Sequence, residues 1–533
     1  MKERYLKATS EHNTSVTFST IHSVCYSILN SGNLNSNYRL LPEKEKIDFL
    51  KKTIIKYQER NRGFVRIPGL INLFLKESAA FERSGLSFDD YRLQYCDREF
   101  FKFAQTALQS FKEKFGYFDF DDMAKMSDRL LTEPGGSEVI AGKFEFVLVD
   151  EFQDTGVDQF KFLKKLCKND NFYAVGDEDQ SIYGFRGACP EIMINFKDYF
   201  DDCRIYSLPE NYRSTNSIVR RANNLISKNK KRYNKNMVSM SPACDCDGLK
   251  IISAYNEIEE MNQLVSEIRK ARMSGDSVAV LARTCNILEK VATRLTKENI
   301  KFCLKDNLTN IFEHPKVRMI MSFFKAIVGR AEASDFVVIL RSAGIQVNEG
   351  IATAGNLSWS LLKEVCTDAR IRQLERHIIR LKKYSPETAL EFIRNVIGVE
   401  RGLSEYDRGK LDEFRGVIHG LSTIESVFEL EENYEVIREK RDVKNAVILS
   451  TIHSSKGLEF DRVFVPFVNE GVIPYARAIA ENGKEEERRI MYVAMTRARK
   501  FLTLSWHETF LNKKAMQSSF IKELEIKKRL DNF

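Results

Sequence analysis

Two adjacent carboxylates at the end of a predicted strand are the first residues of this sequence whose types and spacing could do chemistry. The apolar run 146–149 (FVLV) is typical of a short buried strand, and Asp150 and Glu151 follow it directly. One such carboxylate could hold Mg²⁺ beside a triphosphate while the other takes a proton from the attacking water. Acidic pairs at strand ends are also common in solvated loops, so this pair alone does not identify a site.

A second polar segment follows the next predicted strand. Residues 174–188 (AVGDEDQSIYGFRGA) combine Gln180 with Tyr183, Phe185 and Arg186 in a loop punctuated by glycines. A single-stranded nucleic acid needs flat rings on which its bases stack and cations that contact its phosphates. We therefore interpret this loop as part of a single-strand track, with a buried aromatic corner as the alternative.

Three further segments carry aromatic or basic residues that could contact a nucleotide. They are LPENYRS (208–214), STIHSSKGLEF (450–460) and EEERRIMYVAMTRARK (485–500). Tyr212 in the first could stack on a base, and Arg213 and Arg497 could contact phosphate. Arginine suits phosphate because its planar fork bonds two oxygens and keeps its charge. Each arginine alone is better explained as a surface ion pair, but the ordered set favours phosphate binding.

Length and composition describe an ordinary globular protein with several domains. The chain has 533 residues, and 83 Lys and Arg against 75 Asp and Glu leave a net charge of +8. At about 150 residues per domain this length predicts three or four domains, and the mild basicity permits a polyanionic partner. The ten cysteines show no C-x-x-C spacing, which favours reduced thiols of a cytoplasmic protein. No apolar run is long enough to predict a membrane span.

The elements that must position these residues alternate between strands and helices, which predicts an α/β fold with two parallel sheets. Predicted strands include NFYAVGD (171–177) and RIYSL (204–208), with helices from about Pro190 and after Ser214. The later strands are LKIISAY, SVAVLAR, IKFCL, AVILSTIH, RVFVPFV and FLTLSWH. Regions of about 30–115 and 310–443 have helical spacing and predict helical insertions. The basic run KNKKRYNK (228–235) is interpreted as a solvated helix end.

The ordered set of motifs resembles the UvrD/Rep/PcrA family of superfamily 1 DNA helicases over nearly the whole chain. The motifs are DEFQDT, GDEDQSIYGFRG, LPENYRS, TIHSSKGLEF and EEERRIMYVAMTRAR, with weaker matches in TFSTIHSVCYSIL, FDFDDM, SVAVLARTCNILEKVATRL and NIFEHPKVRMI. The resemblance implies two RecA-like parallel-sheet motor domains, each with a mostly helical insertion. The implied domains are 1A (1–29 and 116–207), 1B (30–115), 2A (208–309 and 444–533) and 2B (310–443).

The resemblance also implies a role for each site residue. Asp150 would bind Mg²⁺, Glu151 would be the general base, and Gln180 would sense the γ-phosphate of ATP. The other implied nucleotide contacts are Tyr212 on adenine, Arg213 and Arg497 on the transferring phosphoryl group, and Glu459 on the ribose, with Gly457 in the same turn. The implied DNA contacts are His22, Tyr183, Phe185, Arg186 and His453. The implied partners are single-stranded DNA and duplex–single-strand junctions, with movement 3′ to 5′.

One part of the family pattern has no counterpart in this sequence. Family members cradle the phosphates with a G-x-x-x-x-G-K-[ST] loop, whose amides and lysine neutralise phosphate charge. The nearest look-alikes here, Gly142-Lys143 and Gly483-Lys484, lack a following Ser or Thr. The opening MKERYLK is similar to the end of the family segment after that loop, so we expect the loop upstream, in a helicase whose front is missing from this reading.

Of two alternatives to a motor enzyme, the first remains open and the second does not fit the motifs. A non-hydrolysing subunit or scaffold that binds single-stranded DNA would need no phosphate loop. An unrelated P-loop kinase or transporter ATPase would have no use for the loop from Gln180 to Arg186. A smaller departure is Ile21 before His22, where the family usually has a phenylalanine that stacks on a base, so one stacking platform is expected to be weaker.

Overall fold

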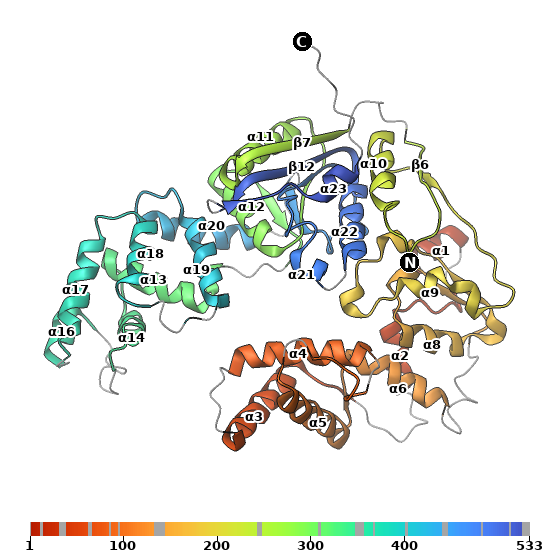
Figure 1. Ribbon diagram of the computed structural model, residues 1–533, viewed down its shortest axis with the longest axis horizontal. Coiled ribbons are helices and arrows are strands. Elements are labelled where there is room, and N and C mark those ends of the chain that lie inside the picture. Colours follow the sequence, from red (N-terminus) through yellow and green to blue (C-terminus); the bar gives the residue numbers. More distant parts are fainter. Residues whose placement is uncertain are drawn as a thin grey trace, which may run out of the picture. The chain divides into compact units, whose positions relative to one another are not determined.

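A computed structural model describes most of the chain. The described residues are 2–10, 14–30, 39–61, 67–84, 87–93, 96–132, 144–241, 248–306, 311–346, 357–365, 368–399, 403, 405–439, 446–480, 483–510 and 513–524. They form two compact units (Figure 1). Unit 1 comprises Met1–Tyr206 with Lys231–Tyr233, and unit 2 comprises Ser207–Lys230 with Asn234–Phe533. The four-domain division predicted above is finer than these units and stays a prediction, and Gly142-Lys143 lies outside the described residues.

Unit 2 is built on a seven-stranded sheet that is parallel except at its β12–β13 edge. Its strands are β7 (Leu249–Asn256), β8 (Val278–Ala282), β9 (Phe302–Leu304), β10 (Val447–Thr451), β11 (Phe460–Val465), β12 (Ala498–Phe510) and β13 (Lys513–Lys514). The neighbour order is β13-β12-β11-β8-β10-β9, and β7 also pairs with β12. Every residue of β8 is buried, as expected for an all-apolar strand of a parallel sheet covered on both faces.

Helices cover this sheet and continue into a separate helical region (Figure 1). Those beside the sheet are α10 (Asn216–Ile226), α11 (Glu257–Met273), α12 (Cys285–Lys297), α21 (Ala476–Ala480), α22 (Lys484–Thr496) and α23 (Ser519–Glu523). Those of the helical region are α13 (Pro315–Val328), α14 (Ala333–Ser342), α16 (Trp359–Val365), α17 (Arg370–Leu381), α18 (Pro386–Asn395), α19 (Glu405–Ile418) and α20 (Glu425–Glu439). This region has its own apolar core, which includes Phe323, Phe324 and Phe414.

Unit 1 holds two short parallel sheets among helices. Strand β1 (Arg39–Leu40) pairs with β2 (Tyr117–Phe118), and β3 (Val147–Val149) pairs with β4 (Phe172–Ala174). Its helices are α1 (Lys2–Thr9), α2 (Ile21–Leu29), α3 (Glu43–Asn61), α4 (Ile67–Ser84), α5 (Arg98–Phe115), α6 (Phe120–Thr132), α8 (Val157–Leu166) and α9 (Pro190–Ile194). The predicted mixed α/β class with parallel sheets is therefore confirmed, and both predicted helical regions contain helices.

One face of the β3–β4 sheet is apolar and exposed. Leu148 and Tyr173 are register neighbours on this face, with 71% and 61% of their surfaces exposed, and Phe146 beside them is 62% exposed. The opposite face, with Val147 and Phe172, packs on the core of unit 1. Parallel sheets normally bury both faces. This sheet therefore lacks a covering layer on one side within the described residues.

The strand predicted at RIYSL (204–208) is not formed. These residues make no ladder with any described strand, and Tyr206 is 79% exposed. A β-branched and aromatic run forms a strand only when a neighbouring strand accepts its backbone hydrogen bonds. The prediction was wrong because the described residues offer this segment no such neighbour.

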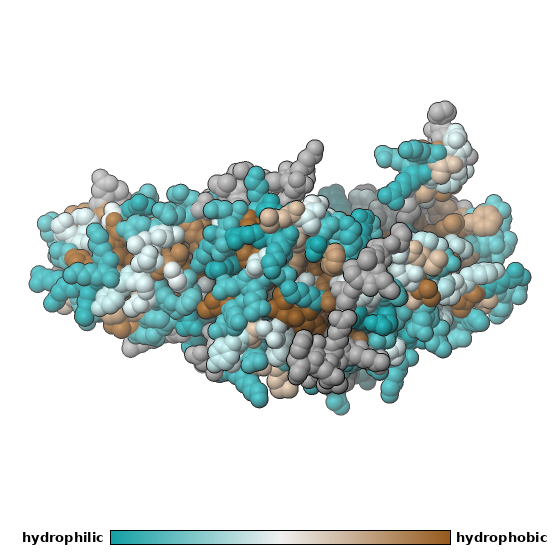
Figure 2. Space-filling model, turned by 90° about the horizontal axis from the view of Figure 1, so that it is seen from above, coloured by the Kyte–Doolittle hydropathy of each residue, from teal (hydrophilic) through white to brown (hydrophobic). Residues whose placement is uncertain are grey.

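None of the described helices is long and apolar enough to cross a membrane. On the face seen in Figure 2, hydrophilic residues cover most of the surface and hydrophobic residues lie among them in patches.

Candidate active site

The acidic pair lies at the end of β3, on a sharp turn of the chain. Asp150 and Glu151 are both exposed, and the backbone amide of Glu151 donates to Asp150 Oδ1 at 2.9 Å. Glu151 has a φ of 51°, in the left-handed region. Such a conformation costs a non-glycine residue on the order of 1–3 kcal/mol and is concentrated at functional sites. The turn leaves both carboxylates at the end of the strand, as the sequence predicted.

A buried glutamine that sequence reasoning missed connects this pair to the next loop. Gln153 donates from Nε2 to Glu151 Oε2 at 2.6 Å, and its Oε1 accepts from the amide of Asp177 at 2.9 Å. The Asp177 carboxylate in turn accepts from Gln180 Nε2 at 2.7 Å. A continuous chain of hydrogen bonds thus runs from the expected general base to the expected phosphate sensor. At Gly176 a Cβ would lie 2.4 Å from Gln153 Oε1, so any larger residue would have to displace the Gln153 amide.

The aromatic loop after Gln180 places an arginine against two rings. The Arg186 guanidinium lies 5.2 Å from the centre of the Tyr183 ring and 5.5 Å from that of Phe185. Phe185 is 53% exposed, which does not fit a buried aromatic corner. Tyr183 is half-buried, and this burial raises the pKa of its hydroxyl. The predicted set is therefore brought together, with one ring on the surface and one cation beside it.

A buried ion pair holds this loop from the inner side. Arg232 donates to both carboxylate oxygens of Asp179, at 3.0 Å from Nε and 2.7 Å from its terminal nitrogen, and both side chains are largely buried. The next amide, of Tyr233, donates to Glu178 Oε1 at 2.9 Å. The interpretation of 228–235 as a solvated helix end was therefore wrong for Arg232 and Tyr233. Only tertiary contacts could have shown this, because the partners lie more than fifty residues away.

Replacing Arg232 by methionine is expected to lower the free energy of unfolding of unit 1 by about 3 kcal/mol, because it removes the cation of a largely buried ion pair with Asp179. The neighbouring pair of Lys231 with Glu191 is exposed, so Lys231→Gln is a matched control expected to cost less than about 1 kcal/mol. Denaturant unfolding monitored by limited proteolysis of unit 1 would compare the two. Equal losses would show that the buried pair does not anchor the loop.

The expected DNA contact His22 has an aromatic neighbour that the sequence did not reveal. His22 is exposed at the start of α2, where the Thr20 side chain caps the helix by accepting from the Ser23 amide. Ile21 packs on the core of unit 1 and offers no platform on the surface. The ring of Phe120 lies 5.9 Å from His22 and is 61% exposed. The only sequence signal for Phe120 was its position in the FDFDDM segment (118–123), which resembles the family pattern.

In unit 2 a carboxylate joins two arginines. Arg213 Nε donates to Glu459 Oε2 at 2.6 Å, and Arg499, which sequence reasoning missed, donates to the other oxygen of the same carboxylate. Hydrogen bonds from Arg499 and Arg213 hold the pKa of Glu459 below its ordinary value. Tyr212 is 70% exposed, and its hydroxyl donates to Glu210, which raises the pKa of Tyr212. The predicted residues Arg213 and Glu459 therefore lie together, and Tyr212 precedes Arg213 with its hydroxyl on Glu210.

Arg497 occupies a different position from the other arginines. It caps the C-terminus of α22 and is buried, donating to the carbonyl oxygens of Val493 at 3.1 Å and Leu458 at 3.3 Å. Gly457, with a φ of 80°, forms the turn before Leu458. Arg497 thus ties this turn to the helix, and its role at a phosphoryl group stays a prediction. His453 is half-buried at the start of the same turn.

Comparison with known proteins matches both halves of the chain to helicases. Residues 1–201 match the UvrD/REP helicase N-terminal domain, and residues 206–399 and 371–509 match the UvrD-like helicase C-terminal domain. The ATP-dependent DNA helicase Rep of Buchnera aphidicola subsp. Acyrthosiphon pisum is 27% identical over 92% of this chain and 83% of its own length. The ATP-dependent DNA helicase PcrA of Staphylococcus epidermidis is 26% identical over 98% of this chain and 78% of its own length. DNA helicase II of Rickettsia typhi is 25% identical over 93% of this chain and 81% of its own length.

Proposed function

Because the chain belongs to the UvrD/Rep family of DNA helicases, we propose that it moves 3′ to 5′ along single-stranded DNA using ATP and opens duplex at junctions. The observation that supports this best is the hydrogen-bond chain from Glu151 through Gln153 and Asp177 to Gln180. It ends three residues before the ring of Tyr183, at the start of the aromatic loop. Three short hydrogen bonds therefore connect the expected general base to the residue at which the aromatic loop begins.

The side chains of each unit suit a separate part of the reaction. In unit 1, Asp150 presents the hard oxygen donor that Mg²⁺ prefers when substrate phosphates supply further ligands. When bound, the ion would neutralise phosphate charge, and Glu151 would accept the proton of the attacking water. In unit 2, Arg213 supplies a cation for the phosphoryl group, and exposed Tyr212 supplies a ring for adenine.

The phosphate cradle is proposed to come from a segment that this sequence does not contain. No G-x-x-x-x-G-K-[ST] loop occurs in the 533 residues. The apolar face at Leu148 and Tyr173, which is exposed among the described residues, supports an incomplete sheet in unit 1. A strand, a glycine-rich loop and a helix would cover this face. The loop would then lie at the strand ends, beside Asp150.

A second candidate is a non-hydrolysing protein that binds single-stranded DNA. The lack of a phosphate loop in this sequence favours this candidate. The aromatic loop could bind single-stranded DNA in such a protein as well as in a motor enzyme. ATP hydrolysis after the missing segment is supplied separates the two candidates, because a scaffold would remain inactive.

Both candidates predict that the chain binds single-stranded DNA oligonucleotides of different sequence with similar affinity, since stacking and backbone charge tolerate any base. Affinity measured by fluorescence anisotropy should fall as salt rises, with a slope of about 0.7 per phosphate contacted. Oligonucleotides of one length and three compositions provide the control for sequence preference. An affinity that does not change with salt concentration, or that is much higher for one sequence than for the others, would contradict the proposal.

A further inference from the structure

A carboxylate outside the predicted motifs binds the start of the turn that carries His453. This turn, the 451–457 turn, begins at the last residue of β10. Asp306, two residues after the end of β9, accepts from the Thr451 amide at 2.7 Å and from the Thr451 hydroxyl at 2.9 Å. The hydroxyl of Ser454 donates to the same carboxylate. One side chain thus binds three donors of a turn that lies 145 positions later in the sequence.

Asp306 continues the pairing of two strands beyond the end of their ladder. Strand β9 pairs with β10 as far as Leu304 and Leu449. The Lys305 amide then donates to the Leu449 carbonyl at 3.0 Å, and the Asp306 carboxylate is the acceptor for the Thr451 amide, two residues further along β10. Thr451 is buried. Removing the carboxylate would take away the acceptor of a buried backbone donor, which is costly.

The bonds of Asp306 enclose His453 in the chain. Thr451 lies two residues before His453, and Ser454 is the residue after it. The Ser454 amide also donates to Thr451 Oγ1 at 3.3 Å, which closes the turn around the histidine. On the far side of the turn, Arg497 holds the Leu458 carbonyl as described above. The position of the half-buried His453 side chain therefore depends on an anchor at each end of the turn.

The 451–457 turn lies at the carboxyl edge of the parallel sheet of unit 2. Thr451 ends β10, and the next amide, of Ile452, donates at 2.9 Å to the carbonyl of Ala282, which ends β8. Ligands of open α/β sheets bind outside the carboxyl ends of the strands. The expected DNA contact His453 and the carboxylate that holds its turn are thus both at the edge where a ligand is expected.

We propose that Asp306 is a positioning residue for single-stranded DNA, which fixes the 451–457 turn so that His453 meets the strand. The inference rests on the proposed function, in which His453 contacts DNA. Asp306 does not contact the strand itself, because a carboxylate repels phosphate and this one already accepts from three donors of the turn. Its effect on DNA binding therefore passes through the shape of the turn.

The test measures binding of a fluorescent single-stranded oligonucleotide to the full chain by anisotropy. Asp306→Ala removes all three bonds and is expected to weaken binding by about fivefold or more, as for the loss of one member of a hydrogen-bond network. Asp306→Asn keeps an oxygen for the Thr451 amide and offers an amino group to the hydroxyl oxygens, so it is expected to bind within about twofold of the parent. Tighter binding by both variants would overturn the proposal, because the carboxylate would then be repelling the strand.

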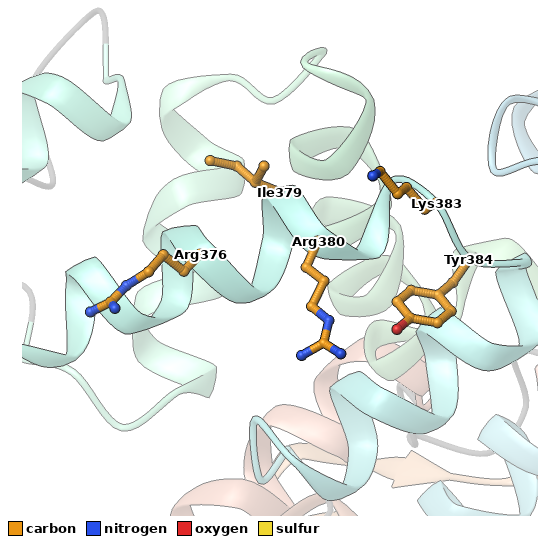
Figure 3. A pocket seen from close by; sticks show the side chains of 5 residues that line it. All are labelled: Arg376, Ile379, Arg380, Lys383 and Tyr384. Carbon is orange, nitrogen blue, oxygen red and sulfur yellow. The ribbon is translucent and has the colours of Figure 1, made fainter.

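A double-mutant cycle tests whether Asp306 acts through the turn. His453→Ala alone should weaken binding, and adding Asp306→Ala to it should cost less than about twofold more, because residues that act through one another are not additive. The control cycle uses Arg376→Ala, on α17 in the concave patch of the helical region that Figure 3 shows. Asp306→Ala should keep its full effect in that background. Full additivity with His453→Ala would overturn the proposal.

Asp461→Ala is the matched control for the loss of a carboxylate that binds backbone and hydroxyl donors. Asp461 accepts from the Ser277 amide at 3.0 Å and the Ser277 hydroxyl at 2.7 Å at the amino end of the same sheet, and it also pairs with Lys500 at 3.1 Å. This variant should leave DNA affinity unchanged. Equal losses in the two alanine variants, or parent-like binding by Asp306→Ala, would overturn the proposal. A parent chain that does not bind the oligonucleotide would instead count against the proposed function.

Discussion

The 533-residue chain by itself is expected to hydrolyse ATP only at a background rate, with or without DNA. Mg²⁺ is held weakly by one or two carboxylates unless phosphates bring it, and Asp150 has no glycine-rich loop in this sequence to hold those phosphates. Supplying a strand, a G-x-x-x-x-G-K-[ST] loop and a helix from a family member is expected to restore DNA-stimulated hydrolysis. Phosphate release at saturating ATP, with and without an oligonucleotide, measures the gain.

Glu151→Gln in the restored protein is expected to lower turnover by about 10²–10⁴-fold, because an amide cannot take a proton from water. The carbonyl oxygen of the new side chain can still accept from Gln153 Nε2, so the hydrogen-bond chain to Gln180 should persist. Nucleotide and DNA affinity should therefore stay close to those of the parent. Wild-type turnover in this variant would exclude Glu151 as the base. Vigorous, Glu151-dependent hydrolysis by the chain alone would show that another loop cradles the phosphates.

Alanine at both Tyr183 and Phe185 is expected to weaken single-stranded DNA binding by about 2–6 kcal/mol, since each lost base–ring stack costs on the order of 1–3 kcal/mol. Arg186 also loses both rings that it contacts. Anisotropy titrations at one salt concentration would measure the difference. Alanine at Phe115 and Tyr255 removes two exposed rings elsewhere and is the matched control. Equal affinity of the Tyr183/Phe185 variant and the parent would place the single strand elsewhere.

Sequence alone determined the elements whose patterns are strong and local. The all-apolar β8, the alternation of strands and helices around it, and the helical character of 310–443 follow from the spacing of apolar residues, which burial requires. The same spacing predicts that a strand ends before Asp150 and Glu151. Their residue types then limit the chemistry to metal binding and proton transfer. These predictions needed no knowledge of which segments meet.

What only the tertiary structure decided depends on partners distant in the chain. The hydrogen bond from Arg213 to Glu459 joins residues 246 positions apart, and no spacing rule predicts it. The burial of Arg232 against Asp179 and the contact of Phe120 with His22 are of the same kind. A hydrogen bond or ion pair forms with whatever group the fold brings near. The run at 204–208 has the composition of a strand but does not form one. The backbone hydrogen bonds of a strand need a neighbouring strand, and the composition of a segment does not show whether the fold provides that neighbour.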